Sequence, residues 1–577
     1  MFVGREKELE SLRLLLDKRT SSLVACRGRR RIGKSTLIEE FARRNHCRLV
    51  SIDGLLPREG MTNQVQLDNF IEKLSAQTGV DGSKVSSWFE AFTRLDQAIA
   101  WDDWTVVLLD EVSWMGRYDA DFPARLKSAW DTLLKHHDRL VVVICGSVST
   151  WIKKNILENT GFAGRFSRDL VVRELPLSQC KAFWGEAAGR IAPSEIVDVL
   201  SVTGGIPRYL EEVNPGLSAN ENIKRMCFER DGVLFGDFKA IFSQVFGEES
   251  VLKQKVLLAL VDGPRTCIEV SEALGVVRGG SLSETLEVLV DAGFVTKDEG
   301  YNPETGKKAR TVKYRLSDNY TRFYLKYVLP HETEILSDTY LFDSLESLPG
   351  WDSVLGLQFE NLVVNNFRDL VMPLHLDGIP VLSAVPYEKR KRSGIGKDED
   401  KGLQVDLLVQ TRKSLYVVEI KRRRHIGESI EAEMAEKVAR LRHKRGFSIR
   451  TALVYEGELA PVVRGNGYFD AIVSAADLIG LSDGNAPLPL LWEQLSRANR
   501  VRFCPSAFRV VSLVRSSSPF CRCAPSSKKS VVSSSYSQSA AFAALALYSP
   551  SSGVQSVART FMHRGARTHP GRDIVTS

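Results

Sequence analysis

The sequence predicts an α/β protein of several domains, the first of them built on a parallel sheet. Three segments are continuously apolar and short enough to be strands: 21–26, 105–109 and 140–145. Helical patterns separate these segments, and apolar strands that alternate with helices are typical of a parallel sheet covered on both faces. With 577 residues, the chain has room for about three to four domains.

Composition and charge are those of an ordinary globular protein with an unusual tail. Hydrophobic residues make up 43% of the chain and charged residues 26%. The formal net charge is +7, but residues 501–577 contribute +9 of it (ten basic residues against Asp573), which leaves −2 for the first 500 residues. The basic balance therefore belongs to the tail and does not by itself indicate that the folded part binds nucleic acid.

The cysteines and the apolar segments indicate a cytoplasmic protein. The nine cysteines show no paired zinc spacing, and we expect free thiols in a reducing compartment. The first ten residues are charged and lack the apolar core of a signal peptide. No uncharged apolar run approaches the ~18 residues that a membrane helix needs. We expect no membrane partner.

A glycine-rich loop follows the first apolar strand and opens a helix. It reads Gly28-Arg29-Arg30-Arg31-Ile32-Gly33-Lys34-Ser35 and fits the pattern GxxxxGK[ST] of a P-loop at every fixed position. Glycines let the backbone N–H groups wrap a phosphate, and the helix N-terminus adds a positive dipole. We expect Lys34 to reach the β- and γ-phosphates, Ser35 to hold Mg²⁺, and Thr36 to line the same site. The loop predicts ATP as the ligand.

Two further strand ends supply polar groups to this site. Residues 106–109 are apolar and lead into Asp110 and Glu111. We expect Asp110 to hold Mg²⁺ and Glu111 to orient the attacking water. The strand at 140–145 leads into Gly146 and Ser147, and Ser147 is a candidate sensor of the γ-phosphate; the alternative is a simple strand-ending serine. Together these features predict a P-loop NTPase fold.

At this point the chain resembles the archaeal-type ATPase family, a branch of the AAA+/STAND P-loop ATPases. The matching segments are 2–6 with Glu8 and Leu9, the P-loop, 108–111, Gly146-Ser147 and the lid motif at 204–210. The resemblance covers roughly residues 1 to 480. It implies ATP hydrolysis with Mg²⁺, a Gly4-Arg5 segment near adenine, and a molecular switch or motor that can be a homo-oligomer.

Two arginines are candidates for contacts with the transferring phosphoryl group. Arg165 follows the sensor strand and could act as an arginine finger, often supplied by a neighbouring subunit. Arg208 lies in the lid motif and could sense the nucleotide from there. Either side chain could equally form a surface salt bridge.

The rest of the chain predicts further domains. We place a P-loop ATPase core at 1–170 and a helical lid at 171–245. A winged helix-turn-helix follows at 250–330, a second α/β domain at 345–485, and a disordered Ser-rich basic tail at 500–577.

The winged helix is a candidate DNA-binding element. Helical patterns at 251–260, 268–274 and 281–291 precede a hairpin at 294–298 and 311–316, and a capping box is expected at Ser281 and Glu284. The wing carries five cations: Lys307, Lys308, Arg310, Lys313 and Arg315. The expected recognition helix carries acids and no Lys or Arg, so docking to protein is at least as good an interpretation.

Carboxylates also gather in the C-terminal domain. If the hairpin at 404–420 turns at Arg412-Lys413, opposed positions sum to 825, and Asp406 faces Glu419. Lys421 shares a face with Glu419. The Asp…Glu-x-Lys pattern resembles the PD-(D/E)XK nuclease superfamily, which implies a restriction-endonuclease-like fold, a metal site of Glu360, Asp406 and Glu419, and Lys421 as the nuclease lysine. An inactive nuclease fold or ordinary surface charges remain alternatives.

Three functional accounts follow from these features. The leading one is an ATPase that acts as a switch or motor. The second is a nucleic-acid-processing enzyme whose ATPase gates a C-terminal nuclease, with DNA as a partner. The third is a signalling switch that binds ATP, and DNA or protein, with negligible turnover.

Overall fold

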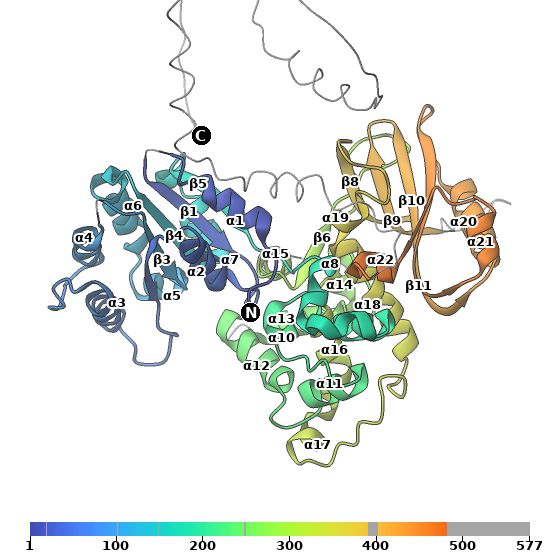
Figure 1. Cartoon of the computed structure of the whole chain (residues 1–577), viewed down its shortest axis with the longest axis horizontal. Coiled ribbons are helices and arrows are strands. Elements are labelled where there is room, and N and C mark those ends of the chain that lie inside the picture. The colour runs from blue at the N-terminus through green and yellow to red at the C-terminus, as the bar shows by residue number, and fades with distance from the viewer. Residues whose placement is uncertain are drawn as a thin grey trace, which may run out of the picture. The chain divides into compact units, whose positions relative to one another are not determined.

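The computed structural model describes residues 1–481 apart from 19, 101, 148, 247–249, 278 and 390–401. Residues Met1–Gln494 form one compact unit, which contains two five-stranded sheets, a two-stranded sheet and many helices (Figure 1). The predicted tail at 500–577 lies outside the described residues. Within the described part, no helix is long and apolar enough to cross a membrane.

The first sheet is entirely parallel, as the apolar strands predict. Its order is β2-β3-β4-β1-β5, and every neighbouring pair runs in the same direction. The strands are β1 (Ser22–Arg27), β2 (Arg48–Asp53), β3 (Thr105–Asp110), β4 (Leu140–Gly146) and β5 (Phe166–Val171). The outer strands β2 and β5 were not predicted, because their polar side chains interrupt the apolar pattern.

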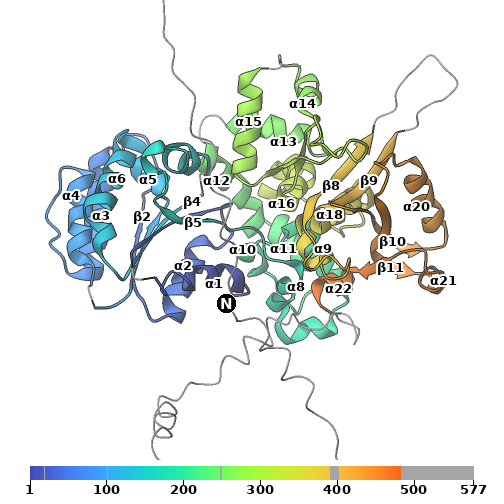
Figure 2. The ribbon, with the colours of Figure 1, turned by 90° about the horizontal axis from the view of Figure 1, so that it is seen from above.

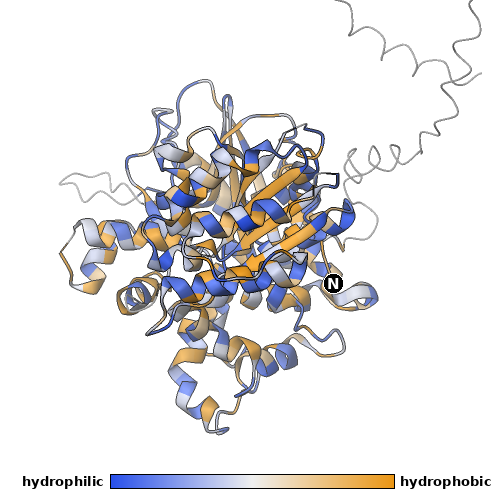
Figure 3. Cartoon of the chain, turned by 90° about the vertical axis from the view of Figure 1, so that its left-hand side faces the viewer, coloured by the Kyte–Doolittle hydropathy of each residue, from blue (hydrophilic) through white to orange (hydrophobic). Residues whose placement is uncertain are grey.

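Successive side chains of these strands point to opposite faces of the sheet and pack into two separate hydrophobic cores. Val106, Val141 and Cys145 pack with helices α1 (Glu6–Arg13) and α2 (Lys34–Arg44). Their neighbours in the strands pack on the opposite face with α3 (Asn63–Thr78), α4 (Trp88–Ala98) and α6 (Phe122–Thr132). Figure 2 shows the two groups of helices on opposite sides of the sheet, and the strands are largely apolar in Figure 3. Burial on both faces explains why the strands lack alternation.

A run of helices follows β5. These are α8 (Leu177–Cys180), α9 (Pro193–Thr203), α10 (Pro207–Leu210), α11 (Ala219–Cys227) and α12 (Val233–Phe246). A 3-10 segment at Lys181–Arg190 joins the first two. The helical character expected for 171–245 is confirmed.

Shorter helices lie elsewhere in the unit: α5 (Val112–Met115), α7 (Ser149–Ile152), α16 (Asn319–Phe323), α17 (Glu332–Leu336), α19 (Phe367–Leu370), α21 (Pro461–Gly465) and α22 (Ala475–Ile479).

Three helices and a hairpin occupy the segment expected to carry them. They are α13 (Ser250–Ala259), α14 (Cys267–Leu274), α15 (Gly280–Asp291), β6 (Val295–Asp298) and β7 (Lys313–Leu316), and the two strands pair antiparallel. The capping box expected at Ser281 is wrong, because α15 begins one residue earlier with Gly279 as its N-cap, and glycine has no side chain to accept a hydrogen bond from the helix N–H groups. The capping box of this segment lies instead at Thr266 and Glu269, at the start of α14.

The second large sheet is mixed. Its order is β12-β11-β10-β9-β8, with β10, β11 and β12 parallel and the β8-β9-β10 pairs antiparallel. The strands are β8 (Val381–Lys389), β9 (Leu403–Thr411), β10 (Ser414–Ile426), β11 (Ser448–Leu459) and β12 (Ala471–Ser474), with helices α18 (Trp351–Asn365) and α20 (Ser429–Arg440). The pairs Leu415–Gln410 and Val418–Leu407 confirm the predicted register of the hairpin.

Candidate functional site

The P-loop joins the end of β1 to the start of α2. β1 ends at Arg27, and α2 begins at Lys34 with Gly33 as its N-cap in a left-handed conformation, φ 84°. A Cβ on Gly28 would lie 2.3 Å from the backbone oxygen of Val172, so only glycine fits there. Backbone geometry therefore explains why the pattern has glycine at both positions. The loop connects a strand to a helix, as the sequence predicts.

The polar side chains expected to hold phosphate and Mg²⁺ lie together at this loop. Lys34 is buried, and its Nζ donates to the backbone oxygens of Gly28 and Arg29, each at 3.2 Å. The Ser35 hydroxyl donates to the Asp110 carboxylate in a short hydrogen bond. A hydroxyl and a carboxylate that converge in this way are a donor set that suits Mg²⁺. Thr36 is exposed in the first turn of α2.

Glu111 and Ser147 form a second contact at the carboxyl ends of β3 and β4. The Ser147 hydroxyl donates to the Glu111 carboxylate at 2.9 Å, and the Ser147 backbone N–H donates at 3.1 Å. Glu111 has a left-handed backbone, φ 47°, which is uncommon for a residue with a side chain. Strain of this kind gathers at functional sites. The structure thus brings together two residues that are 36 positions apart.

The N-terminal segment reaches the P-loop from the other side. Arg5 is buried, and its Nη2 donates to the backbone oxygen of Ile32 at 3.2 Å. Burial lowers the pKa of Arg5. Gly4 lies against the Gln179 side chain, so close that a Cβ on Gly4 would clash with it. The sequence resemblance placed this segment near adenine, and its contact with the loop is compatible with that placement.

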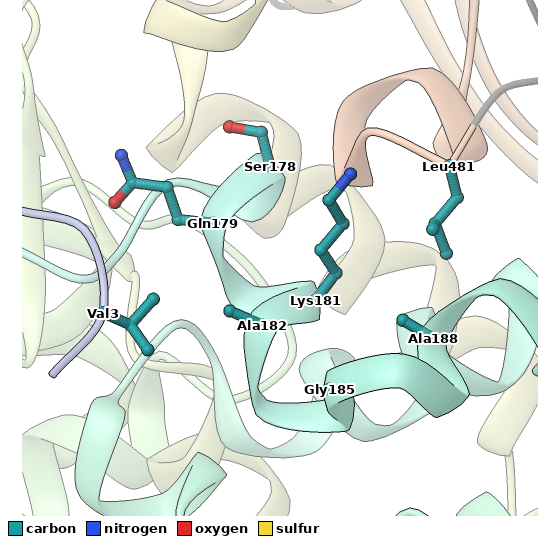
Figure 4. Close-up of a pocket in the computed structure, with 8 residues that line it drawn as sticks. All are labelled: Val3, Ser178, Gln179, Lys181, Ala182, Gly185, Ala188 and Leu481. Atoms are coloured by element: carbon teal, nitrogen blue, oxygen red, sulfur yellow. The ribbon is translucent and has the colours of Figure 1, made fainter. Parts of the chain in front are cut away.

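A pocket of about 420 Å³ opens beside this segment (Figure 4). In Figure 4, Val3 of the N-terminal segment faces Gln179 and Ala182, which come from the helical region after β5. The full lining is Val3, Ser178, Gln179, Lys181, Ala182, Gly185, Ala188 and Leu481. The pocket is large enough for a small planar ring system.

Two P-loop arginines form ion pairs that the sequence did not reveal. The Arg29 guanidinium lies 2.8 Å from Asp318, and both side chains are buried. Although burial opposes the charge, Asp318 holds the pKa of Arg29 above its usual value. Arg31 pairs with Asp237 at 2.7 Å. The partners lie more than 200 residues away in the sequence, and no local pattern could have identified them.

The two candidate phosphate-contacting arginines are engaged in ion pairs within the chain. Arg165 makes a two-point ion pair with Asp131, at 2.8 Å for both contacts. Phe166 pairs with Leu23 near the start of β1, so Arg165 lies at the opposite end of the sheet from the P-loop that follows Arg27. Arg208 pairs with Glu212 at 2.7 Å on its own helix turn. Arg165 therefore does not lie at the nucleotide site of its own chain, and the Arg208 side chain is held by a nearby carboxylate.

The expected acidic cluster does form in the second sheet. Asp406 accepts a hydrogen bond from the Ile420 N–H at 2.9 Å, and Lys421 contacts the fully buried Glu419 at 2.5 Å. Burial and the Asp406 charge raise the pKa of Glu360 to about 7. Burial and the Glu419 charge raise the pKa of Asp406 as well. Burial and neighbouring negative charge therefore both oppose ionisation of Glu360 and Asp406.

Sequence reasoning missed one member of this cluster. Lys437 on α20 donates to Glu419 at 2.5 Å and lies 3.9 Å from Asp406. In the sequence Lys437 is an ordinary helix-surface cation, four residues after Glu433, and nothing marks it as inward-facing. The ammonium groups of Lys421 and Lys437 thus both form ion pairs with the Glu419 carboxylate. Among the described residues, no group of three or more His, Cys, Asp or Glu side chains is arranged to hold a metal ion.

Several cations expected to meet nucleic acid have partners within the chain. Arg315 is buried and pairs with Asp298 at 3.0 Å, while Lys308 and Lys313 pair with Glu299 and Glu388. On β10, Arg422 pairs with Asp198 and Glu456, each at 2.6 Å. The expectation that five wing cations grip a backbone is therefore wrong for Arg315, since its side chain is inside the protein.

The N-terminal part of the chain also matches a known family by sequence. Residues 2–213 match the sequence model of an ATPase domain found predominantly in Archaea. The matched segment has the parallel-sheet α/β fold of a P-loop NTPase. It contains the P-loop, Asp110, Glu111, Ser147 and the Gly4-Arg5 segment, and it ends before the three-helix segment and the second sheet. The match and the geometry together support an ATP-binding ATPase.

Individual relatives are distant. An uncharacterised protein of Methanocaldococcus jannaschii is 24% identical over 423 residues, which cover 72% of this chain and 87% of that protein. Among solved structures, a Walker-type ATPase of Pyrococcus abyssi is 18% identical and covers 56% of this chain and 96% of its own, with a TM-score of 0.38. The Aeropyrum pernix ORC2 protein is 13% identical and covers 58% and 95%, with a TM-score of 0.36. The Thermotoga maritima RuvB Holliday junction branch migration motor is 15% identical and covers 51% and 90%, with a TM-score of 0.30.

Proposed function

We propose that this chain hydrolyses ATP with Mg²⁺ and uses the change of nucleotide state as a molecular switch or motor. The observation that carries the proposal is the joint placement of Lys34, the Ser35–Asp110 pair and the Glu111–Ser147 pair at one end of a parallel sheet. Ligands of open α/β sheets bind at the carboxyl ends of the strands.

Each of these residues has a role that its chemistry supports. Lys34 and the backbone N–H groups of the loop bind the β- and γ-phosphates. Ser35 and Asp110 are the residues that would hold Mg²⁺, which neutralises phosphate charge when bound. Glu111 orients the attacking water. Ser147 fixes the Glu111 carboxylate and lies where it can respond to the γ-phosphate.

The reaction is the transfer of a phosphoryl group to water. The water oxygen bonds to the γ-phosphorus, the bond from that phosphorus to the bridging oxygen breaks, and its electron pair leaves on ADP. The products are ADP, inorganic phosphate and one proton. Because the protein does little covalent chemistry in such a reaction, positioning and charge stabilisation account for the rate.

The test is phosphate release from the purified full chain with ATP and Mg²⁺, measured with and without duplex DNA. We expect steady release that stops when EDTA removes the metal. Tight ATP retention without phosphate release would instead favour a signalling switch with negligible turnover. Stimulation by DNA would support the assignment of residues 250–330 as a DNA-binding winged helix.

A second candidate function is divalent-metal-dependent cleavage of nucleic acid by the C-terminal domain. It is supported by the register that pairs β9 with β10, and by the lysines gathered with Asp406 and Glu419. In this proposal residues 345–485 form a restriction-endonuclease-like domain, and Lys421 steadies the scissile phosphate. Glu360, Asp406 and Glu419 would bind the cation after a rearrangement, because no three acidic side chains of the described residues are arranged to hold a metal ion in this structure.

This candidate has its own test. Wild type and Asp406→Ala are incubated with linear and single-stranded DNA in Mn²⁺ or Mg²⁺. Cleavage that is present in wild type and lost in Asp406→Ala supports the nuclease. Equal products from both proteins, or none from either, count against it and leave a binding or structural role for the domain.

A further inference from the structure

The three consecutive arginines of the P-loop take three different directions. Arg29 turns into the protein, pairs with Asp318 at 2.8 Å and lies over the rings of Tyr209 and Phe294, at 5.7 and 5.3 Å. Arg31 pairs with Asp237 at 2.7 Å. The ion pairs of Arg29 and Arg31 thus anchor the P-loop to residues that follow the parallel sheet in the chain, one on each side of Arg30.

Arg30, the residue between them, faces the nucleotide site instead. Its Nη1 lies 3.6 Å from the Glu111 Oε1, and its guanidinium lies over the Trp114 ring at 5.5 Å. Its side chain is 22% exposed, so it is neither locked in a core like Arg29 nor free at the surface. Arg30 is thus a cation within reach of the carboxylate expected to orient the attacking water.

This placement has a consequence for the ground state. The Glu111 carboxylate accepts the Ser147 hydroxyl and backbone N–H and also faces the Arg30 cation. A carboxylate engaged in this way offers fewer lone pairs to a water molecule. A γ-phosphate that binds between Lys34 and Glu111 brings negative charge next to Arg30, and a guanidinium pairs with phosphate oxygens at least as well as with a carboxylate.

We infer that Arg30 is a catalytic residue that acts within its own chain: it leaves Glu111 when the γ-phosphate arrives and stabilises the charge that develops on the transferring phosphoryl group. The inference rests on the proposed ATP hydrolysis. It also explains why Arg165, at the opposite end of the sheet, need not reach the site of its own chain. The move frees the Glu111 carboxylate for water at the moment when the substrate is in place.

The first test compares the kinetics of Arg30→Ala, Arg30→Lys and wild type. The control is Arg43→Ala, which removes an exposed arginine from α2, the helix that follows the loop. We expect Arg30→Ala to lower kcat by about 100-fold or more, with KM for ATP changed less than about threefold. In the ground state Arg30 only exchanges Glu111 for the γ-phosphate, whereas its contact with the phosphoryl oxygens strengthens in the transition state. Arg30→Lys keeps the charge and should retain more activity. Millimolar guanidinium should partly restore Arg30→Ala.

The second test needs no turnover. Binding of ADP and of ADP with aluminium fluoride, which imitates the transferring phosphoryl group, is measured by calorimetry. We expect Arg30→Ala to weaken the aluminium fluoride complex by about 100-fold and leave ADP affinity unchanged.

The outcomes separate the inference from the function on which it rests. If wild type hydrolyses ATP and Arg30→Ala turns over equally fast or faster, Arg30 is not catalytic and only this inference fails. If KM rises and kcat stays unchanged, Arg30 merely binds ground-state nucleotide, and the inference fails as well. If wild type releases no phosphate under any condition, the proposed hydrolysis itself fails.

Discussion

The nucleotide site and the acidic cluster of the second sheet both gather charged side chains, but they balance those charges differently. In the nucleotide site, Lys34 donates to two backbone oxygens, which carry no formal charge, so its cation is available to an incoming phosphate. In the second sheet, Lys421 and Lys437 already neutralise Glu419. The first arrangement has a place for a charged ligand, whereas the second is satisfied by its own residues.

This difference in charge balance shows that a sequence motif indicates a ligand site more reliably when its charged side chain has no counter-charge from the protein. In the glycine-rich loop, Gly28 is required by its close approach to the Val172 backbone, but the buried Lys34 cation donates to backbone oxygens that carry no formal charge. Phosphate binding is therefore the simplest account of the lysine. An Asp…Glu-x-Lys hairpin, by contrast, can be a metal site or a buried ion-pair network. Predictions that remove one charge at a time distinguish the two arrangements.

The largest effect is expected at the loop lysine. Lys34→Ala removes the cation that reaches the phosphates, and nucleotide affinity should fall by about 100-fold or more while the fold is kept. A fluorescent ATP analogue measures the affinity. Lys84→Ala, at a side chain that is 84% exposed, is the matched control and should bind like wild type. Normal binding by Lys34→Ala would mean that the loop does not cradle phosphate.

The next largest effect is expected in the acidic cluster. The double variant Lys421→Met, Lys437→Met leaves the buried Glu419 carboxylate without a counter-charge, which should cost about 3 kcal/mol of stability. The melting temperature measures the loss, and adding Glu419→Gln should recover most of it. Lys444→Met, at an exposed position beyond α20, is the control.

Divalent cations sharpen this experiment. If the cluster accepts a metal, Mn²⁺ should raise the melting temperature of the double variant more than that of wild type, because the cation replaces the two ammonium groups. No rise with Mn²⁺ would identify a purely structural network. An unchanged melting temperature in the double variant would show that the lysines do not neutralise Glu419 at all.

A smaller effect is expected at the anchor of the loop. Asp318→Asn keeps the shape but leaves the buried Arg29 cation without its carboxylate, and we expect a loss of about 2 kcal/mol. Asp237→Asn should cost less, since its partner Arg31 is 38% exposed. Melting curves of the two variants test the order. A larger loss in Asp237→Asn would contradict the expectation that the buried Arg29–Asp318 pair contributes more stability than the partly exposed Arg31–Asp237 pair.

The last prediction concerns pH. Burial, with the Asp318 charge adding to it, raises the pKa of Glu174 to about 7. The folded chain therefore keeps a proton that the unfolded chain loses near its ordinary pKa of about 4.5, and wild type loses stability as pH rises from about 4.5 to 7. Glu174→Gln cannot titrate, so its melting temperature relative to wild type should rise between pH 5 and pH 8. A constant difference would mean that Glu174 ionises normally.

The sequence predicted the parts of the fold that local pattern controls. The apolar runs at β1, β3 and β4, the loop between β1 and α2, and the register of β9 with β10 all follow from residues close together in the chain. Asp110, at the end of β3, follows because a strand end is visible in the pattern, whereas Glu419 lies inside β10, which extends to Ile426.

Long-range contacts could not be predicted in this way. Arg29 and Arg31 look alike in the loop, and only the folded chain shows that they pair with Asp318 and Asp237 while Arg30 faces Glu111. Lys437 is four residues from an acid on a helix, and that spacing favours a surface pair. In each case the partner is set by packing between distant elements.

The measurement that tests the central claim most directly is phosphate release by Glu111→Gln beside wild type, with ATP binding measured on the same samples. The substitution keeps the shape of Glu111 and a hydrogen-bond acceptor for Ser147 but removes the charge that orients water. We expect ATP to bind both proteins with similar affinity and phosphate release to fall by about 100-fold or more in Glu111→Gln. Equal turnover by the two proteins would contradict the assignment of this site as the one that hydrolyses ATP.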